Sequence, residues 1–111
     1  MKEAVVALAS LPQADGQIKP RPVVVLRQMP PFADWLVCGV STQVQQRVAD
    51  FDELIAPSDP GFGSTGLKTA SVIRLGFLAV LPEADILGAI GSISRERHQR
   101  LLANLCRHLS A

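Results

Sequence analysis

The 111-residue sequence predicts a mainly β fold, a small barrel closed by one C-terminal amphipathic helix. Apolar, β-branched runs of strand length alternate along the chain with turns that contain glycine and proline. From Ser94 onward the pattern changes to leucines at helical spacing. Hydrophobic residues make up 48% of the chain, enough to fill a core, and we therefore expect one domain over residues 1–111.

The first half of the chain predicts four strands. They are expected at residues 3–9, 23–27, 35–40 and 52–56. Residues 11–20 are expected to form a loop, because prolines and an Asp-Gly pair interrupt them. The polar residues 43–50 are compatible with either a short helix or a loop.

The second half predicts a turn, two more strands and the helix. Residues 57–66 contain two prolines and three glycines, which indicates a long turn of the flap type. A strand over 70–81 is expected to bend at Gly76, and after a turn at 82–85 a last strand follows at 86–93.

Ser94 is the expected N-cap of the terminal helix, with Glu96 in its first turn. The apolar face is expected to hold Leu101, Leu102, Leu105, Cys106 and Leu109. The opposite, polar face is expected to hold Arg97, Gln99, Arg100, Asn104 and Arg107. Both histidines, His98 and His108, fall on this helix and are expected to be exposed.

Composition excludes several classes of function. The formal net charge is +1, so the chain has no global basic field for nucleic acid. No apolar run approaches the roughly 18 to 20 residues that span a bilayer. Cys38 and Cys106 lack metal-ligand spacing and are expected to be buried in a reducing compartment, which favours the cytoplasm. The chain has no P-loop, dinucleotide fingerprint or zinc-peptidase motif.

Polar residues at strand ends are the candidates for function. Arg21, held between two prolines, is expected to open the second strand, and Ser41 closes the third with Thr42 and Gln43. Lys68 precedes a later strand and Arg74 follows in it. In an antiparallel sheet the start of one strand lies near the end of its neighbour, so Arg21 and Ser41 are expected to share one rim. Each residue alone is an ordinary surface residue, but together they would form a phosphate site.

Four segments of the chain resemble blocks of the MazF/PemK family of toxin endoribonucleases, in the same order and at similar spacing. They are Lys-Pro-Arg-Pro-Val-Val-Val-Leu at 19–26, Cys-Gly-Val-Ser-Thr-Gln at 38–43, Gly-Leu-Lys-Thr-Ala-Ser-Val-Ile-Arg at 66–74 and Ile-Gly-Ser-Ile-Ser at 90–94. The third block is similar to the PemK-like branch. The resemblance implies the SH3-like barrel of CcdB, MazF and PemK plasmid maintenance toxins.

The resemblance also implies an activity and its partners. It implies the toxin of a type II toxin-antitoxin system, a cytoplasmic homodimer that cleaves single-stranded messenger RNA without a metal or cofactor and so inhibits translation. A cognate antitoxin is the implied protein partner.

By the same resemblance, Arg21 would neutralise the reacting phosphate, Ser41 would orient it with Thr42 as the alternative hydroxyl, and Arg74 would be the acid or charge partner. RNA-binding roles are expected for Lys19, Thr42, Gln43 and Lys68.

The chain departs from the family pattern at three places. The usual short lead-in containing Gly-Asp or Gly-Glu is absent before the first strand, where only Lys2-Glu3 stands. Gly76 stands where the PemK-like pattern often has an acidic residue, and residues 77–81 are apolar where MazF members have a Gln-x-Arg-Thr block. The sequence therefore identifies no general base, although Asp15 could substitute. Two alternatives stay open: a catalytically weakened homologue that binds RNA or an antitoxin, and a CcdB-like toxin that acts on gyrase.

Overall fold

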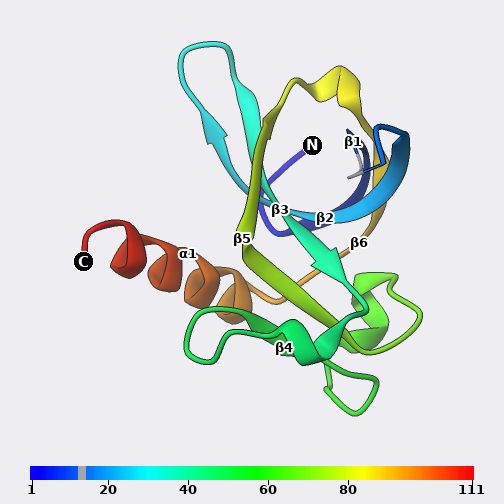
Figure 1. Cartoon of the computed structure of the whole chain (residues 1–111), viewed down its shortest axis with the longest axis vertical. Coiled ribbons are helices and arrows are strands. Elements are labelled where there is room, and N and C mark those ends of the chain that lie inside the picture. Colours follow the sequence, from blue (N-terminus) through cyan, green and yellow to red (C-terminus); the bar gives the residue numbers. More distant parts are fainter. Residues whose placement is uncertain (13–14) are drawn as a thin grey trace.

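A computed structural model describes residues 1–12 and 15–111 and shows an antiparallel sheet curled into a partly open barrel, with one helix against it (Figure 1). The elements are β1 (Val5–Pro12), β2 (Ile18–Met29), β3 (Asp34–Ser41), β4 (Glu53–Ile55), β5 (Ser71–Leu81), β6 (Ile86–Ser92) and α1 (Arg95–Leu109). The six strands of the described chain follow the order β4-β5-β3-β2-β1-β6. The predicted mainly β fold with a terminal helix is confirmed.

Both faces of the sheet carry apolar side chains, which explains the unbroken run of apolar residues in β2. Side chains of a strand point alternately to opposite faces. Val23 and Val25 therefore enter the core inside the barrel, together with Trp35 and Val37 of β3. Val24 and Leu26 enter the second core, which lies beneath α1.

The second strand is longer than predicted, and this corrects the expected position of Arg21. β2 begins at Ile18, so Arg21 lies inside the strand and pairs with Ala9 of β1. The β2–β3 ladder starts only at Val23, so residues 18–22 have a neighbour on one side. The prolines at 20 and 22 are two residues apart, and their missing N–H groups face the same open edge. That edge tolerates prolines that a fully paired strand would not.

The predicted loop at 11–20 is correspondingly wrong. β1 extends to Pro12 and pairs with β2 from Pro12↔Ile18 to Val6↔Val24. Residues 13 and 14 of the predicted loop lie outside the described residues. The local sequence pattern predicts that these prolines interrupt the strands, whereas the pairing of β1 with β2 keeps both strands extended.

The bend predicted in the strand that contains Gly76 is confirmed, as a bulge in β5. Gly39 of β3 pairs with Arg74, but the next residue of β3, Cys38, pairs with Leu78. Residues 75–77 are thus extra on the β5 side, and a bulge of this kind redirects neighbouring side chains.

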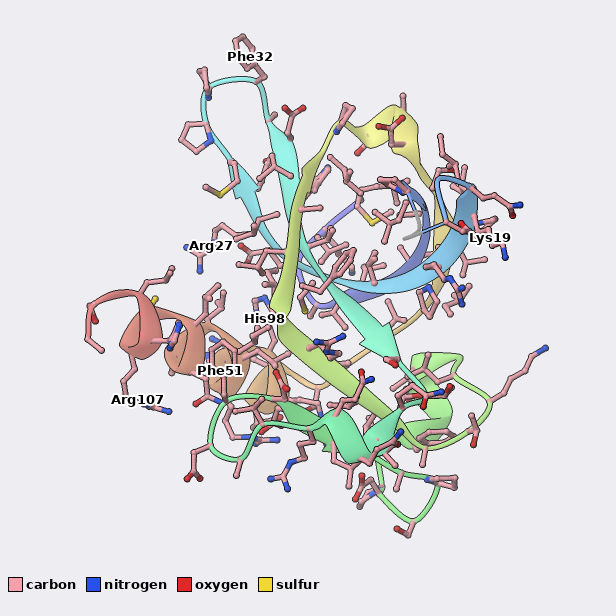
Figure 2. The ribbon with its side chains drawn as sticks, viewed as in Figure 1. Lys19, Arg27, Phe32, Phe51, His98 and Arg107 are labelled. Carbon is pink, nitrogen blue, oxygen red and sulfur yellow. The ribbon has the colours of Figure 1, made fainter. Side chains whose placement is uncertain are left out.

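The terminal helix begins as predicted, with the backbone N–H of Arg97 donating to Ser94 Oγ at 3.1 Å. Its buried face holds Leu101 and Leu105 but not Cys106 or Leu109, which are exposed. The prediction that both histidines are exposed is wrong for His98, which is only 7% exposed. Its Nε2 lies 2.8 Å from the carbonyl oxygen of Leu26 (Figure 2).

The connecting segments follow the sequence pattern in part. The strand predicted at 52–56 is β4, and the ambiguous residues 43–50 contain a 3₁₀ turn over Val44–Gln46. The expected flap at 57–66 ends in a second 3₁₀ turn, Phe62–Thr65, whose Thr65 is buried. Its end is packed closely against Gly91 of β6, so this end does not project as a flap.

The prediction of two buried cysteines is correct for Cys38 and wrong for Cys106. No helix in the described part of the chain combines the length and the apolar character needed to cross a bilayer.

Candidate functional site

The strand register explains why the predicted polar residues converge. Continuing the β2–β3 register past Val23↔Gly39 would set Arg21 opposite Ser41, but the ladder ends at that pair. Arg74 pairs with Gly39 from the other side of β3. Residues opposite one another across strands, and residues two apart on one strand, share a face. Arg21, Ser41 and Arg74 therefore continue the face that lines the barrel interior.

These residues border an open hollow of about 390 Å³ where β2 and β3 part, which we call the mouth hollow. Its described lining residues are Leu11, Arg21, Pro22, Gly39, Val40, Ser41, Thr42, Gln43, Arg74 and Phe77. Five of the seven residues that the sequence singled out thus lie together, although they come from three different strands and the segment after β3.

Ser41 is arranged to donate a hydrogen bond into the mouth hollow. Its Oγ accepts the backbone N–H of Gln43 at 3.0 Å, which leaves the hydroxyl proton available. The side-chain oxygen of Gln43 accepts from Gln45 Nε2 at 2.8 Å, so the amide group of Gln43 has its N–H donors left to offer. The rim after β3 therefore presents donors rather than acceptors.

The charge of the mouth hollow is positive. Arg21 and Arg74 line it, whereas its described lining residues include no carboxylate. Arg74 is half-buried and makes no ion pair with any residue among positions 1–12 and 15–111. Two guanidinium groups beside a hydroxyl and amide donors form an arrangement that suits a phosphate group.

Among the described lining residues, none is a histidine, aspartate or glutamate, so no general base of the usual kind faces the hollow. Asp15, the substitute that the sequence offered, accepts the backbone N–H of Gln17 at 3.0 Å and is exposed. It is not among the lining residues. His98 is bonded to β2 beneath α1, and it faces a different surface depression.

Lys19 and Lys68 do not line the mouth hollow. Lys19 is in the exposed part of β2, on the opposite side of the view from Arg27 at the far end of the strand (Figure 2). Lys68 is exposed in the segment before β5.

Sequence reasoning missed the apolar part of the hollow, Phe77 above all. A Cβ on Gly39 would lie 3.0 Å from Cδ1 of Phe77, so the absence of a side chain at Gly39 makes room for the ring. Phe77 still has 39% of its surface exposed. Its position depends on the bulge at 75–77, for which the sequence carries only the weak signal of Gly76.

Comparison with solved structures defines the class of fold. The Mycobacterium tuberculosis toxin MazF-mt6 matches with a TM-score of 0.70 and 20% sequence identity, over 96% of this chain and 96% of that chain. The fold is therefore that of a MazF-type toxin. A comparison with curated proteins gave no match.

The sequence profile of the family described as PemK-like, MazF-like toxin of type II toxin-antitoxin system matches residues 2–109. The chain belongs to this family. The resemblance stated from the four sequence blocks is thus confirmed.

Proposed function

We propose that this protein is the toxin of a type II toxin-antitoxin system and that it cleaves single-stranded RNA at the mouth hollow. The observation that carries the proposal is the convergence of Arg21, Ser41 and Arg74 in one positively charged hollow. Family membership supports the toxin role. Messenger RNA in the cytoplasm is the proposed substrate, and inhibition of translation the result.

The proposed reaction uses the RNA itself as nucleophile. The 2′-hydroxyl loses its proton and attacks the adjacent phosphorus, and the 5′-oxygen leaves and takes up a proton. The products are a 2′,3′-cyclic phosphate and a 5′-hydroxyl. Arg21 and Arg74 would stabilise the extra negative charge of the phosphorane, while Ser41 would hold a nonbridging oxygen. The protein's share of the catalysis would thus be charge stabilisation and positioning.

Phe77 adds a reason to favour a polynucleotide over a small anion. Single-stranded RNA is recognised through stacking of unpaired bases on exposed aromatic rings, alongside cationic contacts to phosphate. The mouth hollow combines both features, because the exposed ring of Phe77 lines it with the two arginines. We propose that a base next to the scissile phosphate stacks on Phe77.

Inducible expression followed by mapping of cellular RNA ends tests the proposal. We expect growth arrest and new 5′-hydroxyl ends at a recurring sequence. The double variant Arg21→Ala with Ser41→Ala should abolish both effects. Cleavage that persists in this variant would remove the assignment of the site.

Two alternatives correspond to distinct outcomes of that experiment. The absence of an acidic or imidazole group among the described lining residues favours a weakened homologue that binds RNA without efficient cleavage. That protein would bind an oligonucleotide but leave no new RNA ends. Growth arrest with DNA damage and intact RNA would instead indicate a gyrase-directed, CcdB-like toxin.

We also propose a homodimer and an antitoxin that inserts a segment, disordered when free, across the mouth hollow. Apolar side chains exposed on β5 and β6, among them Val80 and Leu87, support burial against a partner. Light scattering at micromolar concentration should give the mass of two chains, and a monomer would contradict the dimer. Antitoxin binding should protect RNA from cleavage.

A further inference from the structure

Asp52 is the most deeply buried carboxylate of the described chain, with 4% of its surface exposed. It makes no ion pair with any described residue. Instead its two oxygens accept backbone N–H groups from two separate segments. Oδ2 accepts from Val48 at 2.9 Å, and Oδ1 accepts from Leu75 at 3.0 Å. Burying a polar group is costly unless it is hydrogen-bonded, and these two bonds satisfy both oxygens.

Leu75 lies directly after Arg74, at the start of the bulge in β5. The ladder from β3 skips residues 75–77, so the amide of Leu75 has no cross-strand partner. Leu75 is also 1% exposed, and its N–H could not turn to water. Asp52 supplies the missing acceptor and thereby fixes the peptide unit that joins Arg74 to Leu75.

Val48 connects the same carboxylate to the segment that follows the Ser41–Gln43 rim of the mouth hollow. Short backbone hydrogen bonds run through the segment after Ser41, from Val44 N–H to Thr42 and from Gln46 N–H to Gln43, both at 2.9 Å. Arg47 N–H then donates to the Val44 oxygen at 3.2 Å. These bonds link residues 42–47 to one another, and Asp52 anchors the segment at Val48.

We infer that Asp52 is a positioning residue that holds the peptide after Arg74, and with it the Arg74 side of the mouth hollow, in place. Its two oxygens tie the N–H of Leu75, next to Arg74, to the N–H of Val48 in the segment that follows Gln43. The inference rests on the proposed cleavage of RNA at this hollow, and it assigns Asp52 no contact with substrate.

The test compares Asp52→Asn with Asp59→Asn. Asn is similar in size but offers one oxygen, so one of the two N–H groups would face an NH₂ donor. Asp59 accepts the backbone N–H of Ala56 at 2.8 Å in the nearby turn and has no bond to the mouth hollow. Asp59 is half-buried and also lies 3.9 Å from Arg97 Nη2, so it controls for the loss of a nearby loop carboxylate that is not bonded to Leu75.

We expect Asp52→Asn to lower kcat on a single-stranded RNA about ten- to a hundred-fold, with a smaller change in KM, because misplacement near 1 Å has this effect. Asp59→Asn should stay within about twofold of wild type. In an Arg74→Ala background Asp52→Asn should cause no further loss, since it acts through Arg74. An equal loss in both backgrounds would show a merely structural role and overturn the inference.

A measurement that needs no activity separates this inference from the proposed function. In nitrogen-15 NMR spectra, Asp52→Asn should shift the Arg74 Nε–H and Leu75 amide signals, while Asp59→Asn should leave both unchanged. If wild-type protein fails to cleave RNA, the proposed function fails and these signals still decide the role of Asp52. Fast exchange of the Leu75 amide in the wild type would overturn the inference without any variant.

Discussion

Cys38 shows at the scale of a residue how burial alone changes the chemistry of a side chain. It lies in the core beneath α1, and burial raises the pKa of its thiol from 9.0 to about 12. The unfolded chain therefore loses this proton near pH 9, whereas the folded chain keeps it. The stability that the protonated Cys38 thiol contributes is therefore fully present below pH 9, and it is lost as the pH rises toward 12.

The predicted slope of this decline is at most about 1.4 kcal/mol per pH unit from this one group. Urea denaturation of the wild type between pH 8 and 10.5 measures it, with Cys38→Ala as the reference that lacks the thiol. The difference between the two proteins should shrink as the pH rises. A constant difference would mean that Cys38 ionises alike in both states.

Individual residues of the candidate site could be predicted to different degrees. Arg21 and Ser41 were recognisable because strand alternation and antiparallel pairing follow from local pattern. Phe77 was not, because its place depends on a bulge. Asp52 and His98 were missed because each bonds backbone atoms of a distant segment, Leu75 and Leu26 respectively. Such partners are set by the tertiary fold and leave no periodic signal.

Elements were predicted better in type than in extent. β3 and α1 lie close to the expected bounds, since an apolar run and a Ser N-cap mark them. β2 begins five residues before the expected start at residue 23, because pairing with β1 keeps two prolines in an extended strand. A proline removes one backbone N–H donor. Whether a strand tolerates this loss depends on whether a neighbouring strand would have paired with that N–H.

The contact of β6 with the turn at 62–65 gives a prediction at the scale of an element. A Cβ on Gly91 would collide with the backbone oxygen of Ser64, so the strand and the turn would have to separate. Gly91→Ala should lower the free energy of unfolding by about 1–3 kcal/mol.

Gly88→Ala is the matched control on the same strand, because its Cβ would meet nothing within 4 Å. Its expected change is within about 0.5 kcal/mol. Chemical denaturation of both variants measures the contrast, and equal effects would mean that the close packing of Gly91 contributes nothing to stability.

The molecule as a whole carries a formal net charge of only +1, so RNA must be attracted by a local field. A site with two phosphate-contacting arginines predicts a shallow salt dependence, with log K falling by about 1.4 per decade of salt for single-stranded RNA. Arg74→Ala should reduce that slope by about 0.7. Fluorescence anisotropy with an uncleavable 2′-deoxy oligonucleotide measures both values, and a much steeper wild-type slope would indicate a wider contact surface.

Cleavage of a single-stranded RNA by purified Arg21→Ala and Arg27→Ala tests the central claim most directly. Both arginines lie on β2, but Arg27 pairs with Glu3 at 2.8 Å at the far end, outside the mouth hollow (Figure 2). Loss of one charge-stabilising donor should lower the rate of Arg21→Ala about 100- to 1000-fold. Arg27→Ala should cleave like the wild type and give the same cyclic phosphate ends. Equal rates in the two variants would contradict the mouth hollow as the site of cleavage.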